Sequence, residues 1–85
     1  MPELCRFFGI VIRMYHDDHP PPHFHATHAG RSAKFAFDGT CIAGGLPRRI
    51  ERLVRRWALQ HTSELERCWE RARSVQDIGT IEPLR

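Results

Sequence analysis

Two short segments with matching alternation of apolar and polar residues constrain the fold of this chain most strongly. They run from His23 to His28 and from Ser32 to Phe37, on either side of Ala29-Gly30. A tight turn at Ala29-Gly30 sets up four cross-strand pairs, which are Phe24–Phe35, Ala26–Ala33, His25–Lys34 and Thr27–Ser32. Apolar residues then meet on one face and polar residues on the other, and a slip of one residue would mix the two faces. The sequence therefore predicts an antiparallel hairpin in this register.

The segments around this hairpin predict further strands. Phe7–Tyr15 is rich in β-branched and aromatic residues, which favours a strand. Its alternate residues are expected to face the core, and these are Phe8, Ile10, Ile12 and Met14. Arg13 and Tyr15 then point the other way. Three consecutive prolines, Pro20 to Pro22, remove three backbone donors and predict a turn before the hairpin. After a turn at Asp38-Gly39, Thr40–Ala43 is expected to form a short further strand.

Helical periodicity begins after Leu46. Apolar residues recur at helical spacing in a first stripe, formed by Ile50, Leu53, Val54, Trp57, Ala58 and His61. Ser63 and Glu66 have the spacing of a capping box, which predicts a second helix with the inner stripe Leu65, Trp69 and Ala72. Strands followed by helices predict an α+β fold, with an antiparallel sheet of three to four strands and two C-terminal helices packed on one face.

A chain of 85 residues is long enough for one domain and too short for two. We expect strands within about 6–43, helices within about 47–74 and an extended tail over 75–85 of a single domain, 1–85. A domain of this size removes only about 60–65% of its unfolded surface from water. A partner surface, from another protein or from a second copy of the chain, is therefore expected to add stability.

Cysteine use and hydropathy argue against a secreted or membrane protein. Cys5, Cys41 and Cys68 are odd in number and far apart, and they lack the paired spacing of a disulfide scaffold or thiolate metal site. The longest apolar run, Phe7–Ile12, is far shorter than the roughly 20 residues of a membrane span. The N-terminus lacks the charged-then-apolar layout of a signal peptide. We therefore expect a cytoplasmic protein without membrane contacts.

The formal net charge is +3, and the basic residues are concentrated in the predicted helices. Arg48–Arg73 contains eight arginines and four glutamates. Such a segment can bind nucleic acid by neutralising phosphates, can dock on an acidic protein, or can be a solvated helix face.

Histidines are clustered around the predicted turn and hairpin. Five of the six lie between His16 and His28, and strand alternation puts His23 and His25 on one face, about 6.5–7 Å apart. Two imidazoles so placed can divide acid and base roles on one substrate, can share a metal ion, or can be ordinary surface residues. Asp18 and His19 are nearby candidates for ligands or orienting groups. His61 continues the apolar stripe of the first helix, so we expect it to be a hydrogen-bonded core residue.

Cationic groups beside the two histidines favour a phosphodiester substrate. Arg13, Tyr15 and Lys34 are expected on the same face, where Lys34 or Arg13 would bind phosphate. His23 and His25 would be the catalytic residues, one taking a proton from a ribose 2′-hydroxyl and the other protonating the leaving oxygen. This predicts a ribonuclease that needs no cofactor. Two alternatives stay open: the histidines and Asp18 hold a divalent ion such as zinc, or the open sheet face docks another protein.

The run Asp17-Asp18-His19-Pro20-Pro21-Pro22-His23-Phe24-His25-Ala26 resembles the signature of a family of small bacterial proteins of unknown function. That signature is Asp-His-x-Pro-Pro-His-Phe-His-Ala. The likeness extends over nearly the whole chain, through Pro2-Glu3, Arg6 to Ile10, Leu46 to Arg49, Trp57, His61, Glu64-Leu65, Trp69 and Ile81 to Leu84. The chain departs from the family pattern at Pro20, where Asn is usual, and at Thr27-His28, where an acidic and aromatic pair is common.

The resemblance implies a component of a bacterial toxin–antitoxin module, with a small protein from a neighbouring gene as its partner. It implies a site at His23 and His25, with Asp18 and His61 beside them. Together with the residue chemistry, it predicts a toxin–antitoxin protein that acts on RNA as a ribonuclease. The alternatives are an antitoxin-like interaction or regulatory partner and a small histidine-based metal-binding domain.

Overall fold

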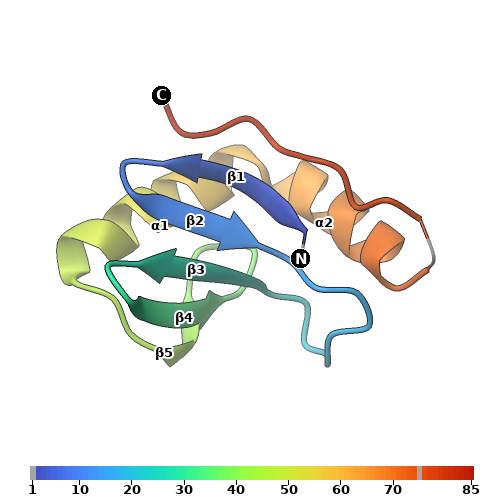
Figure 1. The fold of residues 1–85 in the computed structure, drawn as a ribbon, viewed down its shortest axis with the longest axis horizontal. Helices are drawn as coiled ribbons and strands as arrows, with labels where there is room; N and C mark the ends of the chain where they lie inside the picture. The colour runs from blue at the N-terminus through green and yellow to red at the C-terminus, as the bar shows by residue number, and fades with distance from the viewer. Residues whose placement is uncertain (1, 75) are drawn as a thin grey trace.

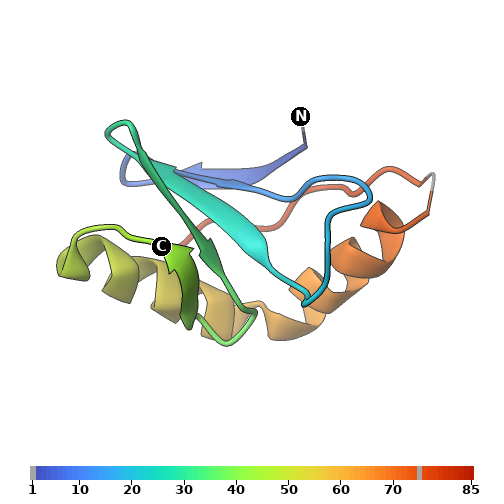
Figure 2. The ribbon, with the colours of Figure 1, turned by 90° about the horizontal axis from the view of Figure 1, so that it is seen from below.

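The computed structural model describes residues 2–74 and 76–85. Five strands form one antiparallel sheet in sequence order, and these are β1 (Glu3–Phe7), β2 (Ile10–Arg13), β3 (Phe24–His28), β4 (Arg31–Phe35) and β5 (Cys41–Gly44). Two helices follow, α1 (Arg48–Gln60) and α2 (Thr62–Ala72). Figure 1 shows the sheet in front of the helices, and Figure 2 shows both helices on the same face of the sheet. The predicted α+β class and the order of sheet and helices are confirmed.

The first predicted strand is in fact a hairpin. Phe7–Tyr15 contains the end of β1, a turn at Phe8-Gly9 and the whole of β2. Phe8 and Gly9 both have left-handed backbone conformations, with φ of 49° and 78°. Phe8 is therefore at the tip of the turn and 64% exposed, so its predicted place in the core is wrong. The sheet begins at Glu3 and has one strand more than expected.

The rest of the sheet follows the sequence pattern. Ile10, Ile12 and Met14 are buried, as predicted, which leaves Arg13 on the opposite face. β3 and β4 pair in the predicted register at all four positions, Phe24–Phe35, His25–Lys34, Ala26–Ala33 and Thr27–Ser32. The predicted fourth strand forms as β5, shifted by one residue. Every strand pairs with its neighbour in the sequence. Two residues that lie directly opposite each other on adjacent strands point to the same face of the sheet.

The two helices cover the apolar face of the sheet. In α1 the buried residues are Ile50, Val54, Trp57 and Ala58, and in α2 they are Leu65, Cys68, Trp69 and Ala72. Trp57 packs against Phe7 and Phe24, with ring centroids 5.9 and 5.4 Å apart. The predicted capping box does not form, since no side chain caps α2. Instead, Thr62 Oγ1 donates a hydrogen bond to the Ala58 carbonyl oxygen.

The C-terminal segment is extended and completes the core. Ile78, Ile81 and Leu84 are buried, and the Ile81 backbone N–H donates to the Leu4 carbonyl oxygen of β1. The segment runs beside β1 in Figure 1. The Trp57 indole N–H donates to the Glu82 carbonyl oxygen at 2.8 Å, which ties the segment to α1. Val75, where the predicted tail begins, lies outside the described residues. In the described part of the chain, neither helix has the length and apolarity to cross a membrane.

Candidate functional site

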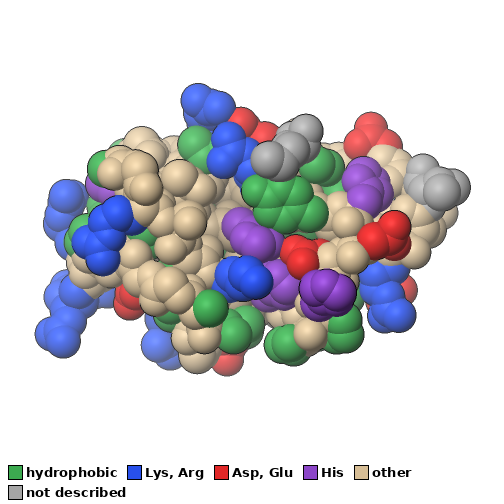
Figure 3. All heavy atoms as spheres, turned by 60° about the horizontal axis from the view of Figure 1, so that its bottom comes forward, with side chains coloured by type: hydrophobic (Ala, Val, Ile, Leu, Met, Phe, Trp, Pro, Cys, Tyr) green, Lys and Arg blue, Asp and Glu red, His purple; other side chains and the backbone are tan. Residues whose placement is uncertain are grey.

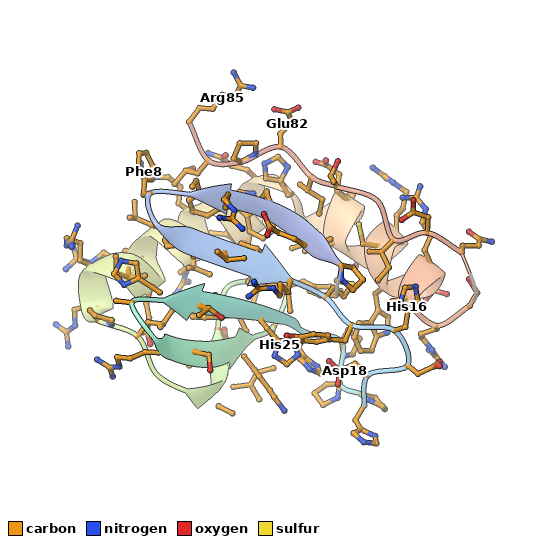
Figure 4. All side chains as sticks on the ribbon, viewed as in Figure 1. Phe8, His16, Asp18, His25, Glu82 and Arg85 are labelled. Atoms are coloured by element: carbon orange, nitrogen blue, oxygen red, sulfur yellow. The ribbon has the colours of Figure 1, made fainter. Side chains whose placement is uncertain are left out.

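The loop between β2 and β3 places Asp18 beside the start of β3. The Asp17 backbone N–H donates to the Ala72 carbonyl oxygen at the end of α2, at 3.0 Å. His16 Nε2 lies 3.2 Å from the Gln76 carbonyl oxygen. Both contacts attach the loop to segments more than fifty positions away in the sequence. In Figure 4, Asp18 on this loop lies next to His25, while His16 lies on the side facing α2.

Two imidazole rings converge on one carboxylate oxygen of Asp18. Asp18 Oδ2 lies 3.1 Å from His23 Nε2 and 2.9 Å from His25 Nε2. The two ring centroids are 5.1 Å apart. The three candidate ligand atoms all lie within 4.8 Å of one another. The sequence identified these three residues, but only the structure shows that Asp18 is their common contact.

The hydrogen bond of His23 fixes a proton on one of its two ring nitrogens. His23 Nδ1 lies 2.7 Å from the Pro21 carbonyl oxygen. A carbonyl oxygen can only accept, so Nδ1 carries a proton, and Nε2 offers a lone pair when the ring holds that proton alone. His23 Nε2 is buried without a hydrogen-bond partner, although Asp18 Oδ2 is near enough for an ion pair. Two lone pairs at this distance repel each other unless a proton or a metal ion lies between them.

His23 and His25 differ in their exposure. The prediction that both rings lie on the open face holds only for His25, whose side chain is 19% exposed and which contacts the Tyr15 ring at 4.6 Å. His23 is 4% exposed and lies 5.6 Å from the Trp69 ring of α2. His23 precedes β3, so strand alternation does not fix its direction, and the hydrogen bond to Pro21 turns its ring inward.

Asp18 is held as a carboxylate. Burial raises the pKa of Asp18, but the hydrogen bond with His25, the His19 backbone N–H and the two nearby imidazoles lower it by more. The net result is a pKa below the ordinary value of 3.8. The His19 backbone N–H donates to Asp18 Oδ1 at 2.9 Å and leaves Oδ2 to the imidazoles. Asp18 therefore remains ionised at neutral pH.

Cationic side chains flank His25 on the open face of the sheet. His25 pairs with Arg13 of β2 on one side and with Lys34 of β4 on the other. A surface pocket of about 160 Å³ adjoins this row, and it is lined by His25, Ser32, Ala33, Lys34, Ala43 and Gly44. Figure 3 shows histidine side chains gathered on this face with acidic and basic side chains beside them. The structure therefore brings the predicted residues Arg13, Tyr15 and Lys34 around His25.

Two other predicted residues take different places. His61 Nδ1 lies 2.6 Å from Glu64 Oε1, and its ring packs against Trp57 with centroids 5.5 Å apart. This agrees with the expected hydrogen bond, although His61 is partly buried rather than in the core, and it separates His61 from Asp18, His23 and His25. His19 contributes its backbone N–H rather than its ring. The roles of the Pro21 carbonyl and of Trp69 beside His23 have no sequence signal, because they depend on the loop path.

The sequence model of a protein family, the domain of unknown function DUF4160, matches residues 9–70 of the chain. The chain belongs to this family. No curated protein and no solved structure matches the chain. The match runs from the β1–β2 turn into α2, so it includes Asp18, His23 and His25. Membership of this family does not by itself indicate an activity.

Proposed function

We propose that this DUF4160 domain binds one divalent transition metal ion, such as zinc, through Asp18, His23 and His25. The observation that carries the proposal is the buried His23 Nε2, which has no donor and faces a carboxylate oxygen. A cation between these atoms replaces a repulsion by favourable ligand bonds, because neutral imidazole and carboxylate are both ordinary zinc ligands.

The surroundings of His23 match those of a ligating histidine. Such a residue usually donates its second ring N–H to a carbonyl or carboxylate, which fixes the ring and the tautomer. His23 makes this contact through Nδ1 and the Pro21 carbonyl oxygen. Asp18 has the equivalent support from the His19 backbone N–H. Both ligands are therefore oriented before the metal arrives.

The donor set favours an open site rather than a closed structural one. Structural zinc sites have four protein ligands, whereas catalytic sites have three and keep a position for water or substrate. Across residues 2–74 and 76–85, no fourth His, Cys, Asp or Glu joins this cluster. At the free position, a bound metal would polarise an oxygen atom of a substrate or lower the pKa of a bound water.

Ribonuclease activity within a toxin–antitoxin module remains a proposal, and the geometry changes the roles of its residues. A metal-free mechanism needs both imidazoles to reach the substrate. His23 is buried and its two ring nitrogens face Pro21 and Asp18, so proton transfer to RNA is closed to it. In the metal-dependent form, His23 and His25 act as ligands, while Arg13 and Lys34 keep the predicted phosphate contacts.

The test is a zinc titration of protein made without a polyhistidine tag and treated first with a chelator. We expect one equivalent per chain, with affinity lowered about 100-fold or more in Asp18→Asn and His25→Gln, since each removes a ligand. His28→Gln is the matched control, because His28 is on the same strand and outside the cluster. Binding below about 0.1 equivalent, or equal loss in the control, would overturn the proposal.

A further inference from the structure

We infer that the proposed metal site opens onto a phosphate-binding subsite, built by Lys34 and Arg13 on either side of His25. The inference rests on the proposed metal site and adds the chemical class of its ligand, a phosphate group on a small ester or on RNA. Three observations support it: the strand register, the adjoining pocket, and the ion pairs of the described residues, none of which involves Lys34 or Arg13.

The strand register puts the two cations beside a metal ligand. His25 lies directly across from Arg13 on one neighbouring strand and from Lys34 on the other. Directly opposed residues on antiparallel strands have Cβ atoms about 4.5–5.5 Å apart and lie on the same face. Arg13 and Lys34 therefore flank His25 on the same face of the sheet, and a ligand bound over His25 lies within reach of both strands that carry them.

The pocket next to His25 has room for a phosphate group. Its volume is about 160 Å³, well above the roughly 10–15 Å³ that a single water needs by the same measure. Small residues keep this space open, namely Ala33, Ala43 and Gly44. Gly44 has φ of 74°, and a Cβ there would meet the Ser32 carbonyl oxygen at 2.5 Å, so a side chain is excluded. Ser32 adds a hydroxyl donor beside Lys34.

The charges of the subsite favour an anion. The pocket lining contains Lys34 and His25 and no carboxylate. Among the ion pairs of the described residues, none involves Lys34 or Arg13. Glu3 is opposite Arg13, but its two carboxylate oxygens accept hydrogen bonds from Arg6 at 2.8 and 2.7 Å. Lys34 thus has its charge available for a ligand, while Arg13 shares the charge of Glu3 with Arg6.

The number of oxygens distinguishes phosphate from carboxylate. A tetrahedral phosphate can place one oxygen on a metal and others on Lys34 and Arg13 at the same time. Arginine forms paired hydrogen bonds with phosphate, and lysine binds it as a compact charge. A carboxylate has only two oxygens in one plane and reaches fewer of these groups. We therefore expect phosphate to bind more tightly than acetate.

The experiment follows the visible absorption of cobalt(II)-loaded protein during titration with inorganic phosphate, adenosine monophosphate and a short single-stranded RNA. We expect a saturable spectral change with each, and about tenfold weaker binding in Lys34→Met, which keeps length and loses charge. Arg31→Met, on the same strand but opposite His28, is the control and should bind phosphate normally. Tighter binding of RNA than of the monophosphate identifies RNA as the natural source, and the reverse order identifies a small ester.

The failures of the two proposals are distinguishable. If cobalt binds but phosphate changes nothing, if acetate binds equally well, or if Lys34→Met matches Arg31→Met, the subsite is wrong and the metal site stands. If cobalt does not bind, the metal site is wrong. Amide NMR shifts of the metal-free protein with phosphate then decide the subsite: shifts at His25 and Lys34 support it, and their absence overturns it.

Discussion

Among the described residues, histidines meet a carboxylate at two places, which differ in how many nitrogens share one oxygen. At the start of α2, His61 meets Glu64, and one proton between the two atoms satisfies both. In the loop before β3, two Nε2 atoms meet the single oxygen Oδ2 of Asp18. His25 can donate one N–H to this oxygen, but the Nδ1–H of His23 is already donated to the Pro21 carbonyl oxygen. His61 and Glu64 therefore satisfy each other with one hydrogen bond, whereas His23 Nε2 faces Asp18 Oδ2 without a proton of its own to donate.

The two contacts also differ in solvent access. Glu64 has a side chain that is 38% exposed, so water can satisfy its remaining lone pairs. His23 Nε2 has no accessible surface and no such relief. A histidine beside an acid is therefore a weak indication of function by itself. Burial of an unmatched acceptor is what separates the Asp18 cluster from the pair formed by His61 and Glu64.

The largest expected effect is stabilisation by zinc. At about 100 times its dissociation constant, a ligand adds about 2.7 kcal/mol to the free energy of unfolding. For a domain of this size, that corresponds to a rise in Tm of roughly 10–20 °C. Scanning calorimetry should show the full rise in His61→Gln and almost none in His25→Gln. Equal shifts in the two variants would remove the distinction between the two contacts.

A smaller effect is expected when Asp18 and Glu64 are each replaced by the amide, and it is measured as the free energy of unfolding of the metal-free protein. The measurement is made at pH 8, where imidazoles are ordinarily neutral. In Asp18→Asn, the oxygen of the new amide keeps the His19 N–H, and its NH2 can donate to the orphaned His23 Nε2 and to His25 Nε2, once the His25 proton has moved to Nδ1. We expect the free energy of unfolding in urea with chelator to rise by about 0.5–1.5 kcal/mol.

The matched change Glu64→Gln should behave differently. It weakens a contact that is already satisfied, and partial exposure limits its contribution, so a loss of about 0.2–1 kcal/mol is expected. A loss of more than about 1 kcal/mol in Asp18→Asn would contradict the claim that Asp18 and His23 repel each other in the metal-free protein.

The smallest expected effect on zinc binding concerns the thiols, which are outside the Asp18 cluster. Burial, and to a lesser extent the charge of Glu3, raises the pKa of Cys5 to about 12. Because the thiolate is the reactive form, alkylation of Cys5 at pH 8 should be roughly a thousandfold slower than that of an ordinary thiol. Mass spectrometry after iodoacetamide treatment measures this. Cys5→Ser should leave zinc affinity unchanged, and a clear drop would point to thiolate ligation instead.

The sequence predicted most reliably what the periodicity of a strand or helix controls. The β3–β4 register and the inner faces of α1 and α2 follow from alternation and helical spacing, and the structure confirms them. The hairpin at Phe8-Gly9 was missed because an apolar residue occupies the turn. Gly9 is the residue of this run that indicates such a reversal.

The sequence indicates the three residues that the structure brings together, but not how they are arranged. Spacing indicates His23 and His25, and Asp18 is only a nearby candidate for a ligand or orienting group. Asp18 reaches both rings because Asp17 is hydrogen-bonded to Ala72, a contact between distant parts of the chain. The burial of His23 against Trp69 depends on the same loop path. Local sequence patterns contain neither contact.

The most direct test of the central claim is a crystal structure of the tag-free protein grown with zinc, with anomalous data at the zinc edge. The account predicts one strong peak about 2.0–2.2 Å from His23 Nε2, His25 Nε2 and an Asp18 oxygen, with no peak at His61. An empty Asp18 cluster in zinc-containing crystals, or zinc bound only between His61 and Glu64, would contradict it.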